Sequence, residues 1–299
     1  MNQLLIICGP TASSKTALAI ECAKILNSEV ISADSMNVYK GLNIGTAKPS
    51  TDEMQGIKHH LIDVVNPTQT FSVGDYKEMA LPIIEKLHIQ NKIPVICGGT
   101  GFYINSLIYD LSYGKSPVNF DAREKYKKIA LEQGNQAVFD ILLKVDPESA
   151  KKLHVNDIKR VIRALEIYES GTKKSDIVDD MKPIFDYKAY SFDFPRADLY
   201  NRIDLRVDQM ISQGLIEEVK NLYSQGINET YQCMQGIGYK EIVPYLKGES
   251  NLEKTILDIK LNTRHYAKRQ ITFFKKLEGL IYLTPDDVKR TAERIIKEL

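Results

Sequence analysis

The run Gly9-Pro10-Thr11-Ala12-Ser13-Ser14-Lys15-Thr16 follows directly on the short apolar stretch Leu4 to Cys8. It matches the pattern of a phosphate-binding loop, a glycine, four free positions and then Gly-Lys-Ser/Thr, except that Ser14 stands at the second glycine. Backbone N–H groups of such a loop curl around phosphate oxygens, the lysine reaches the terminal phosphate, and the next hydroxyl can hold Mg²⁺. The predicted phosphate ligands are Gly9, Thr11, Ala12, Ser13, Ser14, Lys15 and Thr16, and the predicted metal ligand is Thr16.

The surroundings of the loop fit this prediction. An apolar strand precedes it, and residues 16–26 have the spacing of a helix that would direct its N-terminus at an anion. Ser14 must then either take a backbone conformation that glycine reaches more cheaply or let the curve of the loop relax. The alternative interpretation is a Ser/Thr-rich turn between a strand and a helix that binds nothing.

Length and composition limit the class of protein. The 299 residues, 43% of them hydrophobic, can bury a large core and predict more than one structural unit. The four cysteines have no metal-type spacing, and no apolar stretch has the pattern of a signal peptide or a membrane span. We therefore expect reduced thiols, a cytoplasmic location, no membrane association and no obligatory protein partner. The net charge of +1 indicates no partner by itself.

The N-terminal third alternates strands with helices. The short strand Glu29 to Ser32 ends just before Asp34, and ligands of open α/β folds bind at such strand ends. Asp34 is therefore a candidate base or Mg²⁺ partner, while a turn-capping or helix-capping role suits its position equally well. Residues 93–97 form another apolar strand that runs into Gly98-Gly99-Thr100-Gly101, where glycines let a ligand approach the backbone. Two such turns predict one shared crevice.

Residues 113–194 are rich in charged residues and in helical spacing, and they predict an inserted, mainly helical subdomain. One of its helices carries Lys159, Arg160 and Arg163. On spacing, this helix could contact a polyanion, or it could be a solvated helix with Glu166 and Glu169 as intrahelical partners.

Beyond Pro195 the chain is again helical. An apolar stripe from Ile203 to Leu222 predicts a helix, with Arg202 and Arg206 one turn apart near its start. Residues 259–277 hold six cations and no acid, interleaved with aromatic rings, a composition that suits contact with an RNA backbone. The predicted fold is α/β, a P-loop NTPase-like parallel sheet core with helical C-terminal part (residues 1–112 and 195–299) and the helical insert at residues 113–194.

Several motifs, taken together and in order, resemble the tRNA dimethylallyltransferase family, and they cover nearly the whole chain. That family transfers an isopentenyl group from dimethylallyl diphosphate to N6 of the adenosine 3′ to the anticodon. Its usual residues differ at three places, where this chain has Ser14 for Gly, Asn37 for Gln and Phe273 for Trp. The motifs that carry the resemblance are Gly9 to Thr16, Ile31 to Gly41, Ile44 to Pro49, Gly98 to Tyr103, Arg163 to Glu166, Gly236 to Glu241 and Thr263 to Gln270.

The resemblance implies roles for individual residues. The phosphate-binding loop would hold a diphosphate leaving group, with Arg206 as a further ligand and Mg²⁺ as cofactor at Thr16. Asp34 would accept the amine proton, and Thr100 would orient the reacting groups. The partners implied are dimethylallyl diphosphate and the tRNA anticodon stem-loop. The implied tRNA-binding residues are Asp34, Ser35, Met36, Asn37, Thr100, Arg123, Lys159, Arg160, Val161, Ile162, Arg163, Gln235, Arg264 and Lys268.

Two other functions fit parts of the sequence. A P-loop small-molecule kinase would also have this nucleotide-binding type of core and an inserted lid, but it would consume ATP. A non-catalytic RNA-binding module with a decayed loop would explain Ser14, but it would transfer no prenyl group.

Overall fold

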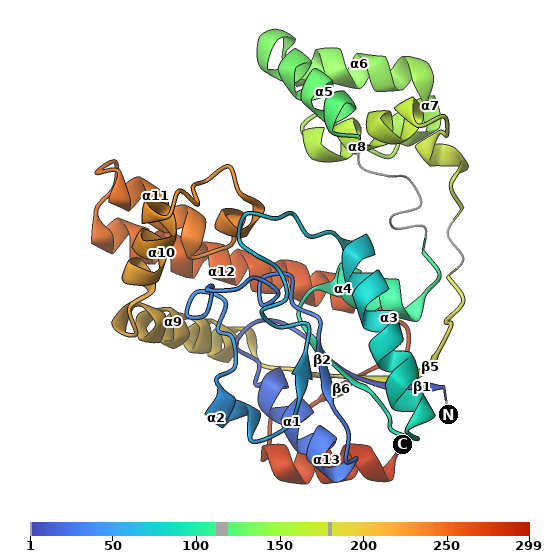
Figure 1. Cartoon of the computed structure of the whole chain (residues 1–299), viewed down its shortest axis with the longest axis vertical. Helices are drawn as coiled ribbons and strands as arrows, with labels where there is room; N and C mark the ends of the chain where they lie inside the picture. Colours follow the sequence, from blue (N-terminus) through green and yellow to red (C-terminus); the bar gives the residue numbers. More distant parts are fainter. Residues whose placement is uncertain (1, 112–118, 179–180) are drawn as a thin grey trace. The chain divides into compact units, whose positions relative to one another are not determined.

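The computed structural model describes residues 2–111, 119–178 and 181–299, which form two units (Figure 1). The core unit comprises Met1–Ile108 and Pro183–Leu299, and the helical unit comprises Tyr109–Lys182. The predicted boundary at residues 112 and 113 lies outside the described residues. At the other end the helical unit stops at Lys182 and not at residue 194, because Asp186–Phe192 is a strand of the central sheet.

In the described part of the chain, six parallel strands form one sheet in the order β3-β2-β4-β1-β5-β6. The central strand β1 pairs with β4 on one side and β5 on the other, so Ile7 lies between Cys97 and Tyr190. Because all strands run the same way, the loops after β1, β2 and β4 meet at one edge, where open α/β folds bind ligands. The strands are β1 (Gln3–Cys8), β2 (Val30–Ser32), β3 (His59–His60), β4 (Val95–Gly98), β5 (Asp186–Phe192) and β6 (Leu280–Leu283).

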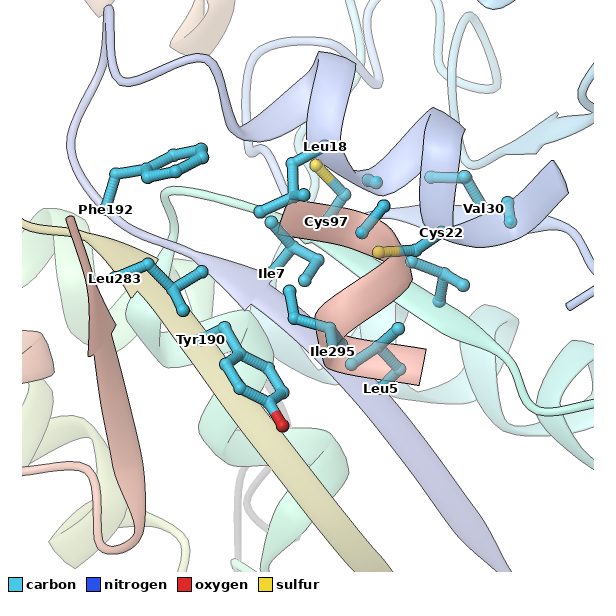
Figure 2. Packing of buried hydrophobic residues seen from close by; sticks show 14 residues of the cluster. Leu5, Ile7, Leu18, Cys22, Val30, Cys97, Tyr190, Phe192, Leu283 and Ile295 are labelled. Atoms are coloured by element: carbon cyan, nitrogen blue, oxygen red, sulfur yellow. The ribbon is translucent and has the colours of Figure 1, made fainter. Parts of the chain in front are cut away.

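Both faces of β1 are buried, as expected for the middle of a parallel sheet. On one face Leu5 and Ile7 pack with Leu18 and Cys22 of helix α1 (Lys15–Ile25) and with Ile295 of α13 (Val288–Lys297) (Figure 2). The alternate residues Leu4 and Ile6 point to the other face and are 0% and 1% exposed. The strand that precedes the phosphate-binding loop is therefore fixed by packing on both sides.

The other helices of the core unit lie between and after the strands. The stripe that predicts one helix across residues 203–222 covers two, because the chain turns at Gly214 (φ 99°). No helix of the described residues is both long and apolar enough to cross a membrane. These helices are α2 (Thr51–Met54), α3 (Val73–Ile89), α4 (Gly101–Ile108), α9 (Arg196–Ser212), α10 (Leu215–Ser224), the 3₁₀ helix η2 (Gln232–Gln235), α11 (Tyr239–Leu246) and α12 (Leu252–Phe274).

The helical unit has a core of its own, which includes a buried ion cluster. Val161 and Ile162 are 0% and 6% exposed in that core, so their side chains are not available for contact with tRNA. Glu166, which is fully buried, is bound by Arg123 and Arg163, each at 2.9 Å. A carboxylate without such partners would be too costly to bury. The unit contains α5 (Phe120–Gln133), α6 (Asn135–Val145), α7 (Pro147–Ala150), α8 (Ile158–Glu169) and the 3₁₀ helix η1 (Lys174–Asp176).

Asp146 holds two segments of the helical unit together. Its Oδ1 caps α7 by accepting from the Ser149 N–H at 3.0 Å, and its Oδ2 accepts from the Ser175 N–H at 3.1 Å. Burial raises the pKa of Asp146, but the hydrogen bonds from Ser149 and Ser175 outweigh it and lower the pKa from 3.8 to about 2. The stabilising effect of the carboxylate is thus complete above pH 3.8 and is lost as the pH falls toward 2.

We expect Asp146→Ala to destabilise the helical unit by about 2 kcal/mol, because a cap is lost and the Ser175 N–H loses its acceptor. Hydrogen exchange of the amides of residues 148–151 and 174–177 in the full chain measures the effect. Asp157→Ala is the matched control, since Asp157 also precedes a helix but, within the described residues, its side chain makes no capping hydrogen bond. Equal protection in both variants would contradict the role of Asp146.

Candidate active site

The phosphate-binding loop has the curved form that its sequence predicts. It connects β1 to α1, and Gly9, Ala12 and Ser14 have positive φ angles of 134°, 61° and 61°. Of the two possibilities for Ser14, the structure has the first: the serine takes the left-handed conformation and the curve does not relax. A left-handed residue other than glycine costs roughly 1–2 kcal/mol, so other contacts must stabilise the loop.

Lys15 and Arg206 are two of the cations that contact the loop. The half-buried Lys15 donates from Nζ to the Pro10 carbonyl at 3.2 Å, and Arg206 of α9 donates to Thr11 Oγ1 at 3.3 Å. Burial lowers the pKa of the Lys15 ammonium; Cys97 opposes this shift, Arg206 adds to it, and Asp34 opposes it. Burial also lowers the pKa of Arg206, which the Asp34 and Glu53 carboxylates oppose. Because burial disfavours the charged forms of Lys15 and Arg206, a bound anion stabilises these two charges.

A second arginine of α9 binds the outer side of the loop. Arg202 donates from Nε to the Ala12 carbonyl at 2.8 Å and from NH2 to Ser14 Oγ at 2.7 Å. Its guanidinium also lies 4.8 Å from the centre of the Phe194 ring. The sequence shows the one-turn spacing of Arg202 and Arg206, but it does not show which of them reaches which loop atom.

Gln270 of α12 connects the two turns at the sheet edge. Its Oε1 accepts from the Thr11 N–H at 2.9 Å, and its Nε2 donates to the Gly99 carbonyl at 2.9 Å. Gln270 is 5% exposed. A Cβ on Gly99 would lie 2.1 Å from Gln270 Nε2, so a larger residue there would displace the end of the Gln270 side chain and break this bridge. The sequence places Gln270 in a family motif, but only the fold reveals this bridge.

Asp34 and Thr100 lie on neighbouring strand ends. Asp34 accepts from the Met36 N–H through Oδ1 at 2.9 Å. Thr100 does not reach Asp34 directly: its Oγ1 accepts from the Ser35 N–H at 3.0 Å, and its own N–H donates to the Ala33 carbonyl at 3.0 Å. Thr100 thus fixes the segment on either side of Asp34.

A cavity of about 550 Å³ opens over this edge of the core unit. It brings together most of the predicted site residues of that unit, while Gly9, Thr100, Arg264 and Lys268 are outside its lining. The predicted residues that line it are Thr11, Ala12, Ser13, Ser14, Lys15, Thr16, Asp34, Ser35, Met36, Asn37, Arg206 and Gln235.

Two lining residues present polar groups with unusual surroundings. Asn37 is 9% exposed, and its Oδ1 has no hydrogen-bond partner among the described residues. Burial raises the pKa of the Tyr266 phenol, and the Asp34 carboxylate raises it further, so this hydroxyl keeps its proton. The cavity lining therefore contains a neutral hydroxyl at Tyr266 and, at Asn37, a buried amide oxygen that has no hydrogen-bond partner among the described residues.

Glu218 of α10 supports one wall of the cavity. Its carboxylate accepts from the N–H groups of residues 43, 44 and 45 at 2.9, 2.8 and 3.1 Å, and from the Tyr239 hydroxyl at 2.6 Å. Gly45 lies against the Tyr239 ring, where a Cβ would come within 2.5 Å. Glu218 is not predicted as a site residue from the sequence, because nothing in its spacing indicates partners so distant along the chain.

The basic helix α12 divides into paired and exposed cations. The Arg264 guanidinium donates to both carboxylate oxygens of Asp204 on α9. The same guanidinium lies 5.5 Å from the centre of the Tyr200 ring. It therefore packs α12 against α9. Lys268 and Arg269 are exposed, and Arg269 lines the cavity.

The residues present fit a magnesium ion bound with a phosphate group. Thr16 supplies a hydroxyl and Asp34 a carboxylate, both on the cavity wall, and Mg²⁺ prefers oxygen ligands. Across residues 2–111, 119–178 and 181–299 there is no cluster of three or more His, Cys, Asp or Glu side chains that could hold a metal. Magnesium in phosphate sites needs no such cluster, because substrate oxygens and water complete its shell.

A parallel α/β sheet, a loop of the phosphate-binding pattern after β1 and a carboxylate after β2 on the wall of the same cavity define a P-loop-type α/β protein. Comparison with known families is more specific. The profile of the family described as IPP transferase matches residues 37–277, and the chain belongs to this family.

The relatives match along all of this chain and along most of their own length. The chain is 44% identical over 303 residues to the tRNA dimethylallyltransferase of Acetivibrio thermocellus, covering 100% of this chain and 96% of that protein. Among solved structures, the tRNA isopentenylpyrophosphate transferase of Bacillus halodurans has a TM-score of 0.75 at 39% identity, covering 100% of this chain and 97% of the other. A eukaryotic dimethylallyltransferase acting on tRNA has a TM-score of 0.83 at 30% identity, covering 100% and 80%.

Proposed function

We propose that this chain is a tRNA dimethylallyltransferase that transfers the dimethylallyl group of dimethylallyl diphosphate to N6 of the adenosine 3′ to the anticodon. The observation that carries the proposal is that the phosphate-binding loop, Arg206 and Asp34 line the same cavity. The names of the relatives support the same reaction. We place the protein in the cytoplasm, where its tRNA substrate is made.

The diphosphate is the leaving group. Loop N–H groups, the Lys15 ammonium and the Arg206 guanidinium surround it and neutralise the charge that develops as the carbon–oxygen bond breaks. Mg²⁺ held at the Thr16 hydroxyl would supply further charge neutralisation. The Cys97 thiol also lines the cavity, but burial raises its pKa to about 11, so it is not a competing nucleophile.

The acceptor is the exocyclic amine of adenine, which must leave the base stack to enter the cavity. As the new bond forms between N6 and the prenyl carbon, Asp34 takes the proton that N6 loses. Thr100 holds the segment around Asp34 through the Ser35 N–H and so orients the carboxylate. The Oδ1 of Asn37 is buried and has no partner among the described residues, so the amide would have to turn toward the cavity to accept from an amino group or N–H of the RNA.

Binding of the anticodon stem-loop falls to exposed cations. Lys268 and Arg269 lie on α12 of the core unit, and Lys159 and Arg160 lie exposed on α8 of the helical unit. Such side chains bind phosphates without reading sequence. We leave Arg264 out of this group, because Asp204 already occupies its guanidinium.

Incubation of the full chain with labelled dimethylallyl diphosphate, Mg²⁺ and bulk tRNA tests the function. We expect label in the RNA, at N6 of the adenosine next to the anticodon, without ATP. Turnover that requires ATP would instead identify a small-molecule kinase. Tight tRNA binding with no incorporation of label would identify an RNA-binding module.

Replacing Lys268 and Arg269 together by glutamine is expected to lower tRNA affinity. Removal of one phosphate-binding cation reduces the slope of log K against log salt by about 1, so the slope of the double variant should fall by about 2. Titration of tRNA at several salt concentrations measures both quantities. Lys289→Gln with Lys297→Gln is the matched control, because it removes the same charge from α13. An unaltered slope in the first variant would remove this surface from the proposal.

A further inference from the structure

Ser14 makes an unusual contact for a serine at the start of a helix. A serine before the first helical residue ordinarily accepts a hydrogen bond from one of the next N–H groups. Ser14 has φ 61° and ψ 15°, and within the described part of the chain its side chain caps no backbone N–H of α1. Its hydroxyl is instead the acceptor for Arg202 NH2 at 2.7 Å.

The same guanidinium binds the other left-handed residue of the loop. Ala12 also has φ 61°, and its carbonyl accepts from Arg202 Nε at 2.8 Å. A guanidinium is rigid and planar, so both bonds form only when Ala12 and Ser14 keep their relative positions. One side chain therefore fixes both strained residues.

This contact also orients the loop toward the cavity. In a trans peptide the C=O and the following N–H point in opposite directions. Because the Ala12 carbonyl points at Arg202, the Ser13 N–H points away from it, and Ser13 lines the cavity.

Arg202 acts from outside the cavity. Arg206 belongs to the cavity lining, whereas Arg202 does not belong to it among the residues that the structure describes. The ring of Phe194, 4.8 Å from the guanidinium, helps to hold its plane. These two arginines thus have different roles, Arg206 facing the ligand and Arg202 the outer side of the loop.

We propose that Ser14 and Arg202 form a coupled pair that holds the phosphate-binding loop in its anion-binding shape before the diphosphate arrives. Ser14 gives up the conformational freedom of glycine and supplies the acceptor that glycine lacks, so the substitution is compensated and the loop is not decayed. Arg202 is a positioning residue in this pair. The inference rests on the proposed function in that the ligand is a diphosphate.

Three variants separate strain from hydrogen bonding, with inorganic diphosphate and Mg²⁺ as the calorimetric probe. Ser14→Ala keeps the strain and loses the acceptor, and we expect binding about tenfold weaker, the effect of one hydrogen bond to a charged group. Ser14→Gly removes the backbone strain as well as the acceptor, and we expect binding within about threefold of the unaltered protein. Arg202→Lys keeps the charge but lacks the two guanidinium donors that reach Ala12 and Ser14, and we expect diphosphate binding to be about tenfold weaker.

Coupling is tested by combining the changes. Arg202→Lys should cost about tenfold in the chain that keeps Ser14 but about threefold or less when it is combined with Ser14→Gly, since the bond to the serine hydroxyl is then already absent. In the free protein, hydrogen exchange of the amides of residues 13–16 should be at least about fivefold faster in Ser14→Ala. For prenyl transfer, Ser14→Ala should raise KM for dimethylallyl diphosphate while kcat stays near its original value.

Arg196→Lys is the control on the same helix, because Arg196 contacts Tyr200 and not the loop. It should change none of these quantities. The proposed coupling would be overturned if Arg202→Lys weakened diphosphate binding equally in the chain with Ser14 and in the chain with Ser14→Gly. Unchanged hydrogen exchange of residues 13–16 in Ser14→Ala would overturn it too. Failure of the unaltered protein to bind diphosphate would overturn the proposed function, and exchange in the free protein would still report on the loop.

Discussion

Replacing Asp34 by asparagine is expected to lower kcat for prenyl transfer by about 10² to 10⁴-fold, the range that a positioned general base contributes. Asparagine has the same shape but cannot take the N6 proton. It keeps an oxygen for the Met36 N–H, which donates to Asp34 Oδ1 at 2.9 Å, so the loop that follows should hold its conformation. Single-turnover incorporation of labelled prenyl group into tRNA measures the effect.

The affinity for tRNA separates chemistry from binding in this variant. It should stay within about twofold, since a neutral isostere removes no phosphate contact. Asp198→Asn is the control, because Asp198 is exposed in the first turn of α9 and should leave both quantities unaltered. Retained turnover in Asp34→Asn would remove the base assignment and leave the capping role that the sequence already allows.

The features that sequence predicts well here depend on neighbours along the chain. The apolar stretch before Gly9, the loop pattern and the helical spacing after it are local, and together they predict β1, the loop and α1 correctly. The α/β fold follows from repetition of that unit. The conformation of Ser14 stays open in the sequence, because local rules allow both a strained and a relaxed loop.

Features that depend on distant partners could not be predicted. Residues 11 and 270 share a hydrogen bond across the fold, and no spacing rule connects them. Arg264 illustrates the converse: in the sequence it is one cation in a basic run, but the packing of α12 on α9 gives it Asp204. The break at Gly214 is missed because the apolar stripe continues across it.

Burial corrects the predicted interface in the same way. Val161 and Ile162 lie beside Arg160 in the sequence and so fall within one candidate tRNA-binding stretch. On a helix, consecutive residues face different directions. Arg160 is exposed while its two neighbours fill the core of the helical unit.

Replacing Lys15 by methionine is expected to weaken binding of inorganic diphosphate by about 10²-fold, because a charge-assisted bond to the leaving group is removed. Calorimetric titration in the presence of Mg²⁺ measures it. Lys24→Met is the matched control: Lys24 lies on the same helix, paired with Glu21 at 2.6 Å and away from the cavity. Unchanged affinity in Lys15→Met would exclude the lysine as a phosphate ligand.

The pH dependence gives this prediction a second, independent test. Burial lowers the pKa of Lys15 below its ordinary 10.5, so the free protein begins to lose this charge at a pH under that value. A bound anion favours the ammonium, and diphosphate affinity should therefore fall as the pH rises through the pKa of Lys15. Lys15→Met should abolish that part of the pH dependence. It should also leave the melting temperature equal or higher, because a half-buried charge held for the ligand opposes folding while it has no anion beside it.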